Sequence, residues 1–212
     1  ALHLDVLTHG QGDFSQRLTD YLTSFKGENE RQAREDILLV NFDHPLPENY
    51  QPKELVCLYE QRHSFRLANS NIYLARECYE PMERMFAAAE AENVNGFIVT
   101  SGYRDYQRQQ EVYAQSEPGK AQEAGASEHQ TGLAMDLSSP DCMVLNTWFD
   151  TTDAFKWLSE HCAEYGFIIR YPKGKTDITG YDYEPWHLRY VGVDAAEEIT
   201  EQGITLEEYL KR

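Results

Sequence analysis

The sequence contains few basic residues for its length. It has 19 Lys and Arg against 36 Asp and Glu among 212 residues, which gives a formal net charge of −17. An acidic surface repels phosphate backbones and anionic lipid headgroups, so nonspecific binding to nucleic acid or to such membranes is disfavoured. We therefore expect no nucleic-acid partner. Most of the acidic excess is typical of a solvated surface, and it also allows a carboxylate-rich pocket to attract a cation.

Long apolar runs are missing as well. No stretch approaches the ~20 residues that a membrane-spanning helix needs. No basic segment followed by an apolar one opens the chain, which begins at Ala1 rather than Met. This start is compatible with an export signal or an anchor that has been removed, so membrane association is expected only through an anchor outside this sequence.

Closely spaced cysteine pairs are also lacking. The four cysteines stand at positions 57, 78, 142 and 162, and no two of them form a CxxC pair. A structural zinc knuckle is therefore not indicated. Two alternatives stay open: disulfides in an exported protein, with Cys142–Cys162 as the first pair to test, or buried free thiols.

The apolar content is sufficient for a folded domain. Hydrophobic residues make up 41% of the chain and charged residues 26%, both close to globular averages. Residues 1–36 are polar, with a helix expected over 15–24, and are expected to be an N-terminal extension of unassigned role. Residues 37–212 are expected to form one domain.

Helical and extended patterns alternate along residues 37–212. The predicted helices cover 67–93, 105–115, 152–165 and 206–210, and the predicted strands cover 97–100, 133–137, 167–171 and 186–191. Gly96 and Gly166 are placed to end the helices before them, and Asp105 is placed to cap the helix that it begins. Pro81 predicts a kink or a split in the first helix. This order favours an α+β fold in which an antiparallel sheet is backed by helices.

His129 lies seven residues before Asp136, with a glycine between them. On a straight helix the two side chains would stand ~10 Å apart along the axis, too far for one ion with bonds of about 2 Å. Gly132 disfavours a helix here. A turn at Gly132 that leads into a strand would instead bring both side chains to one point, with Asp136 facing a cleft and its apolar neighbours facing the core.

His187 follows Glu184-Pro185-Trp186 and is predicted to enter the cleft at the start of a strand, with Glu184 close by. Two neutral imidazoles and one carboxylate leave zinc with a net charge of +1 and an open position for water, the pattern of a catalytic site. A carboxylate beside such a site can take a proton from the water. From the residues alone, ordinary histidines at both positions stay an open alternative.

The two motifs together resemble a known signature. Ser-x-His-x-x-Gly-x-Ala-x-Asp at 127–136 and Glu-x-Trp-His at 184–187 are similar to the motifs of the VanY-type zinc D,D-carboxypeptidases. That family is related to the VanX dipeptidases and to L,D-carboxypeptidases of bacterial cell walls. The similarity extends to 101–104 and 166–192 and covers roughly residues 37–195.

The resemblance implies specific roles for individual residues. It implies a zinc ion held by His129, Asp136 and His187, with Glu184 as the general base. It also implies that Arg104 stabilises the oxyanion of the transition state. It further suggests two substrate contacts, Gln109 and Ser127, each of which has an ordinary structural alternative.

The implied activity is removal of the C-terminal D-alanine from peptidoglycan stem peptides by a monomeric extracellular enzyme that faces the cell wall. Tyr171 is a candidate for the pocket wall, with a core role as the alternative. Three other functions stay open: an L,D-carboxypeptidase acting on tetrapeptide stems, a non-catalytic cell-wall binding module, and a structural protein with incidental zinc. Glu184 and Arg104 argue against the binding module, because binding alone needs no base.

Overall fold

The computed structural model describes residues 34–61, 63, 65–117 and 120–211, together with residues 16, 19, 20, 23 and 32. The chain divides into two compact units after Leu38, and the fold belongs to the second unit, which begins at Leu39. The helix expected over 15–24 lies largely outside the described residues, and the role of residues 1–36 stays open.

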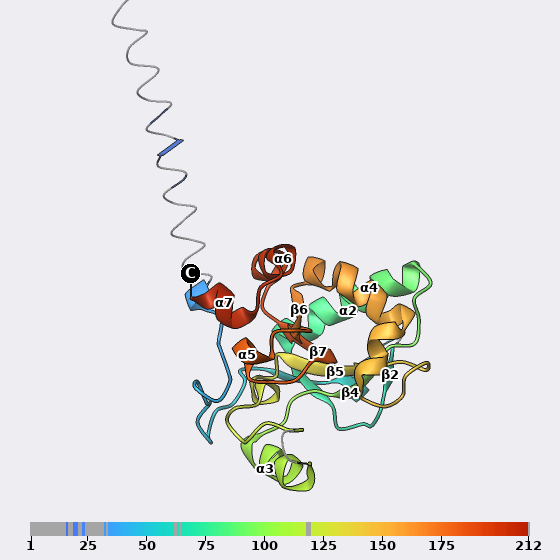
Figure 1. The fold of residues 1–212 in the computed structure, drawn as a ribbon. Helices are drawn as coiled ribbons and strands as arrows, with labels where there is room; N and C mark the ends of the chain where they lie inside the picture. The colour runs from blue at the N-terminus through green and yellow to red at the C-terminus, as the bar shows by residue number, and fades with distance from the viewer. Residues whose placement is uncertain are drawn as a thin grey trace, which may run out of the picture. The chain divides into compact units, whose positions relative to one another are not determined.

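A five-stranded sheet forms the centre of the fold (Figure 1). Its spatial order is β2 (Arg66–Leu67), β4 (Ile98–Ser101), β5 (Ala134–Ser138), β7 (Glu184–Tyr190) and β6 (Phe167–Tyr171). Within this sheet β2 and β4 are parallel, and the other neighbours are antiparallel. A separate antiparallel pair joins β1 (Leu55–Cys57) to β3 (Tyr73–Ala75).

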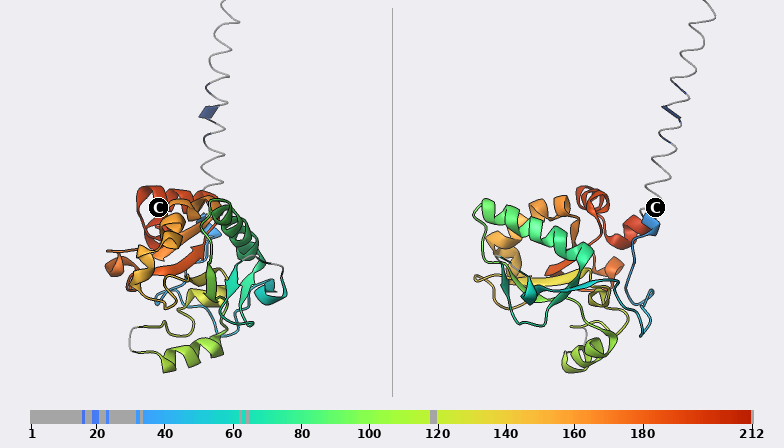
Figure 2. Two further views of the ribbon diagram at one scale, coloured as in Figure 1. Left: turned by 90° about the vertical axis from the view of Figure 1, so that its right-hand side faces the viewer. Right: turned by 180° about the vertical axis from the view of Figure 1, so that it is seen from behind.

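Helices lie on both sides of the central sheet. The views agree that α2 (Arg76–Ala91), α4 (Asp153–His161) and α6 (Val193–Gln202) lie on one side and α3 (Tyr106–Gln115) on the other (Figures 1 and 2). The shorter elements are α5 (Thr176–Thr179), α7 (Leu206–Leu210), and the 3-10 turns η1 (Leu58–Glu60), η2 (Glu128–Thr131), η3 (Thr147–Thr151) and η4 (Cys162–Tyr165). The predicted α+β fold, an antiparallel sheet backed by helices, is confirmed, with one parallel pair added.

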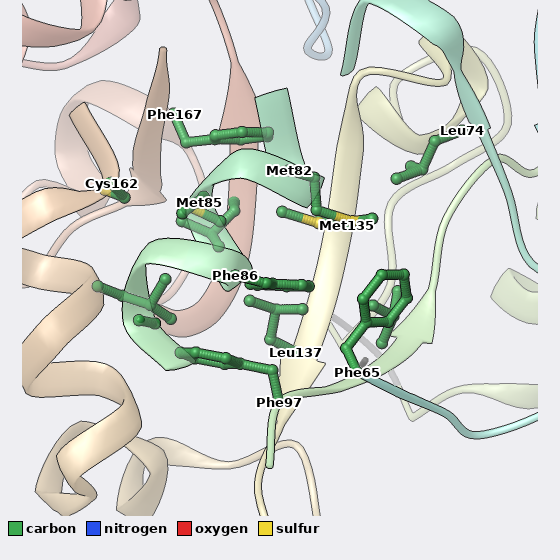
Figure 3. Packing of buried hydrophobic residues seen from close by; sticks show 14 of the residues in the cluster. Phe65, Leu74, Met82, Met85, Phe86, Phe97, Met135, Leu137, Cys162 and Phe167 are labelled. Carbon is green, nitrogen blue, oxygen red and sulfur yellow. The ribbon is translucent and has the colours of Figure 1, made fainter. Parts of the chain in front are cut away.

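The apolar core lies between α2 and the sheet (Figure 3). Met82 and Met85 of α2 are fully buried in the same cluster as Met135 and Leu137 of β5. Full burial of an apolar side chain of this size stabilises the fold by about 1.5–3 kcal/mol. Because side chains alternate along a strand, Asp136 between them points to the opposite face of the sheet.

The helix predicted over 67–93 is shorter in the structure. It begins at Arg76, and the segment before it contains the strands β2 and β3. The side chain of Asn69 accepts a hydrogen bond from the Asn71 backbone N–H at 2.9 Å, a local turn that competes with helix formation. Pro81 lies inside α2 without splitting it.

Several predicted boundaries have visible physical causes. The Asp105 carboxylate accepts a hydrogen bond from the Arg108 backbone N–H at 2.7 Å and so caps α3, as expected. Gly166, at φ 84°, ends the helical segment before β6. That segment is α4 followed by η4, with the change of helix type at Cys162. Helix α6 was not predicted.

All four cysteines are free thiols, so the pairing of Cys142 with Cys162 is not formed. The Cys142 thiol instead donates to the Val144 carbonyl oxygen at 3.2 Å. Burial raises the pKa of the Cys162 thiol to about 12, which leaves it unreactive. Within the described part of the chain, no helix combines the length and apolar character needed to cross a membrane.

Candidate active site

His129, Asp136 and His187 converge on one face of the sheet. One ligand atom from each lies within 4.8 Å of the others, and all three side chains are buried. Asp136 of β5 and His187 of β7 are paired directly across the two strands, which puts their side chains on the same face. The three residues predicted as metal ligands are therefore brought together.

The His129 ring is oriented by the chain around it. Its η2 turn ends at Gly132, whose φ of 72° gives the predicted turn before β5. Nδ1 lies 2.7 Å from the Gly102 carbonyl oxygen. Because a carbonyl only accepts, Nδ1 carries the proton. Nε2 therefore carries the lone pair, and this atom lies 3.2 Å from the Asp136 Oδ2 atom.

The His187 ring is held from three sides. Its Nδ1 atom lies 2.9 Å from the Asp136 Oδ1 atom. Its Nε2 atom lies 3.7 Å from Oε2 of Glu128. The Tyr171 ring stacks against it with a centroid distance of 5.1 Å. Nδ1 is therefore the nitrogen of His187 that faces the cluster.

The electrostatics of the cluster suit a cation. Burial lowers the pKa of His129 to about 4, and the nearby Arg104 guanidinium acts in the same direction, so this imidazole is neutral. Burial alone would raise the pKa of Asp136, but the two histidines hold it well below its usual range. Burial opposes protonation of His187, yet the Asp136 and Glu128 carboxylates raise its pKa to about 9. Two imidazole nitrogens and a carboxylate oxygen are a donor set that fits zinc.

A cavity of about 1020 Å³ opens over the cluster and is lined by its three residues and by Glu184 and Arg104. Burial raises the pKa of Glu184 to about 7, although His187 acts against this shift. A carboxylate whose pKa lies near neutrality can both take up and release a proton under physiological conditions. Glu184 therefore has the properties of a general base.

An irregularity in β7 explains how Glu184 and His187 share this cavity. Three residues apart on a regular strand, they would point to opposite faces. The pairing with β6 shifts between Ile169↔Leu188 and Tyr171↔Glu184, so two residues of β6 span four of β7. Such a bulge redirects side chains next to functional sites.

Arg104 lies just beyond β4 and is fixed by several hydrogen bonds. Its backbone N–H donates to the His129 carbonyl oxygen at 3.1 Å. Its Nε donates to Oε1 of Gln109 at 2.7 Å, and its Nη1 donates to the Ser101 hydroxyl. Nη1 also lies 4.0 Å from Oδ2 of Asp136. The guanidinium is thus held beside the candidate metal site.

The two predicted substrate contacts and the candidate residue for the pocket wall lie behind the lining of the cavity. Gln109, Ser127 and Tyr171 are buried, and none of them lines the cavity. Gln109 orients Arg104, and Tyr171 stacks on His187, so this geometry favours supporting roles for both. The Ser127 Oγ atom has no hydrogen-bond partner among the described residues, and its role as a substrate contact stays a prediction. Tyr183 does line the cavity.

Sequence reasoning missed a buried ionic network behind the cluster. Oε1 of Glu128 accepts hydrogen bonds from Arg170 Nε at 2.7 Å and from Arg189 Nη1 at 2.8 Å. Arg170 also donates to the Glu207 carboxylate of α7, at 3.0 Å for one of the two bonds. The available signal was an arginine among apolar residues in each of two predicted strands, because buried arginine requires an acidic partner.

Glu184→Gln is expected to stabilise the metal-free protein at high pH. Below the ordinary glutamate value of 4.5, the carboxyl is protonated in both the folded and the unfolded chain, so the two proteins should be similarly stable. Between 4.5 and about 7 the unfolded chain loses the proton first, so the wild type loses stability relative to the variant. Thermal unfolding of chelator-treated proteins at about pH 5 and pH 8 checks this. A difference in Tm that does not grow with pH would contradict the raised pKa.

Comparison with known proteins identifies the family. The model of the VanY family, described as D-alanyl-D-alanine carboxypeptidase, matches residues 71–193. The chain belongs to the VanY family. The family prediction made from the two motifs is confirmed, and with it the prediction that the protein is a carboxypeptidase.

Relatives of this VanY-family chain include proteins named for different carboxypeptidases. YodJ of Bacillus subtilis (strain 168), which carries the name of a carboxypeptidase, is 44% identical over 85% of this chain and 69% of its own length. The structure of the LD-carboxypeptidase LdcB is 42% identical, with a TM-score of 0.72 over 82% of this chain and 84% of that one. A mutant of the vancomycin-resistance D,D-pentapeptidase VanY, in complex with Zn(II), is 34% identical, with a TM-score of 0.66 over 81% of this chain and 97% of that one.

Proposed function

We propose that this VanY-family protein is a zinc-dependent D,D-carboxypeptidase that removes the C-terminal D-alanine from peptidoglycan stem peptides. The observation that carries the proposal is the convergence of His129, Asp136 and His187 beneath a cavity that Glu184 and Arg104 also line. The D,D-activity named in the family description and the Zn(II) complex of a structural neighbour support it. We further propose that the protein acts outside the cell, where such peptides lie.

Glu184 is the proton carrier in this proposal. Zinc bound at the cluster would act as a Lewis acid that polarises the scissile carbonyl and acidifies the attacking water. The Glu184 carboxylate accepts the proton of that water and then donates it to the nitrogen of the departing D-alanine. Burial supports both steps, because it brings the pKa of Glu184 to about 7.

Arg104 is proposed to stabilise the negative charge that develops on the carbonyl oxygen. Its guanidinium is permanently charged and provides donors in a fixed planar arrangement. Gln109 and Ser101 hold that plane beside the metal site before a substrate arrives. A preorganised donor of this kind contributes more than one that must first be reoriented.

A second candidate activity is L,D-carboxypeptidase, which would release D-alanine from a tetrapeptide stem. It is favoured by the likeness to LdcB, which has the higher identity and TM-score of the two structures compared above. Both reactions break the bond before a C-terminal D-alanine, and the same metal, base and arginine would serve either one. The difference lies in the residue that precedes this bond.

The two activities are separated by a direct assay. The zinc-loaded protein is incubated separately with a pentapeptide stem and with a tetrapeptide stem, and the products are identified by mass spectrometry. We expect the pentapeptide to yield tetrapeptide and D-alanine, with a higher kcat/KM than the tetrapeptide. Faster conversion of tetrapeptide to tripeptide would favour the L,D-activity instead. Release of D-alanine from neither peptide would contradict both.

A further inference from the structure

Two buried polar atoms beside the candidate metal site face each other. Oε2 of Glu128 and Nε2 of His187 both lack a hydrogen-bond partner within the normal distance range, and neither is accessible to solvent. They lie 3.7 Å apart. Buried polar atoms in native proteins are nearly always paired, so each is the natural partner of the other. An approach of about 0.5 Å would bring them into hydrogen-bond range.

We propose that Glu128 is a positioning residue, whose carboxylate accepts a hydrogen bond from Nε2–H of His187 and so keeps the lone pair of Nδ1 directed at the metal. This inference rests on the zinc site of the proposed function. A neutral imidazole carries only one N–H, so an acceptor at Nε2 determines that Nδ1 is the metal-binding atom. A carboxylate in this position also makes the ligand more basic.

The Glu128 carboxylate is held rigidly enough for this role. Its other oxygen, Oε1, accepts from both Arg170 and Arg189 at 2.7 and 2.8 Å. These bonds fix the plane of the carboxylate and leave Oε2 as the atom available to His187. The two guanidinium groups also compensate a charge that could not otherwise be buried at this depth.

The two histidines of the cluster are positioned by different chemistry. His129 donates from Nδ1 to a neutral backbone carbonyl, that of Gly102. His187 faces a carboxylate through the opposite nitrogen, Nε2. The zinc-loaded protein should therefore contain one histidine bound through Nε2 and one bound through Nδ1. Only the second depends on an ionic side chain.

Glu128→Gln tests the proposal because Arg170 and Arg189 determine the orientation of the new glutamine amide. The amide oxygen must take the place of Oε1 to accept from Arg170 and Arg189, so the NH2 group takes the place of Oε2. A donor then faces Nε2 of His187 and favours the tautomer with the proton on Nδ1, which blocks metal binding. The dissociation constant for zinc, measured by competition with a chelator, is expected to rise by about 10–100-fold.

Glu207→Gln is the matched control. Glu207 pairs with Arg170 in the same buried network but, among the described residues, forms no hydrogen bond with His129, Asp136 or His187, so its change weakens the network without altering the partner of His187. Both variants are expected to lower Tm, but the zinc dissociation constant of Glu207→Gln should change by less than about 3-fold. Equal losses of zinc affinity in the two variants would show that Glu128 has only a structural role. So would wild-type zinc affinity in Glu128→Gln.

A second measurement needs no variant. In a long-range ¹H–¹⁵N correlation spectrum of the zinc-loaded wild type, the nitrogen that retains a proton can be distinguished from the one that binds the metal. We expect His187 to keep its proton on Nε2 and His129 to keep its proton on Nδ1. A spectrum in which both histidines bind through Nε2 would overturn the proposal. Because neither experiment uses a peptide, a failure here is distinct from a failure of the proposed hydrolysis.

Discussion

Glu184→Gln is expected to lower kcat by about 10³-fold, within the range that positioned acid–base groups contribute. The amide has nearly the same shape as the carboxylate but cannot accept the proton of the attacking water. The three proposed metal ligands are untouched, so the variant should retain zinc and its fold. Steady-state hydrolysis of stem peptides, with zinc determined by elemental analysis of the same preparation, measures both quantities.

Glu54→Gln provides the comparison for this variant. Glu54 is an exposed carboxylate that pairs with Arg76 and does not line the cavity, so its replacement should leave kcat unchanged. Normal turnover in Glu184→Gln would show that Glu184 is not the general base. Loss of zinc together with turnover would instead indicate that Glu184 helps to hold the metal, and the two roles are distinguished by the same pair of measurements.

The convergence of His129, Asp136 and His187 was predictable from the sequence because its geometry depends on local chain features. His129 and Asp136 are separated by a glycine that permits a positive φ, and the alternation of apolar residues after it identifies which face of β5 Asp136 occupies. The partner strand carries His187 in a motif of its own. Two local signals of this kind, combined with the family resemblance, were sufficient to predict that the three residues converge.

The sequence places Glu184 near His187, but two features of the site depend on contacts between distant segments. These are the bulge that brings Glu184 into the cavity and the ionic network around Glu128. Glu184 reaches the cavity through a bulge in the pairing of β7 with β6, and a strand register depends on contacts between segments that are distant in sequence. Glu128 lies within a recognised motif, yet its partners Arg170 and Arg189 are 42 and 61 residues away. No local periodicity indicates such a pairing.

The same reasoning explains the errors in secondary structure. The segment before Arg76, which the predicted helix included, forms strands because β3 pairs with β1 and β2 pairs with β4. Tertiary pairing overrides local propensity in short segments of this kind. The caps at Asp105 and Gly166, which depend only on neighbouring backbone groups, were predicted correctly.

His187→Ala is expected to abolish both zinc binding and hydrolysis. The variant lacks one of the three converging donors, and the remaining two, His129 and Asp136, leave a divalent ion with too few protein ligands for a stable mononuclear site. The ratio of zinc to protein after dialysis should fall from near one in the wild type to near zero. Thermal unfolding should be measured in parallel, because the change also leaves the buried Glu128 Oε2 without its neighbour.

His161→Ala is the matched control, because it removes a partly exposed imidazole that pairs with Glu164 at 2.8 Å and lies outside the cluster. It should retain zinc and turnover. A folded His187→Ala protein that keeps a full equivalent of zinc would show that the ion binds elsewhere. Together with Glu184→Gln, which should keep the metal and lose turnover, the pair separates metal binding from proton transfer: hydrolysis requires both, and each variant removes one.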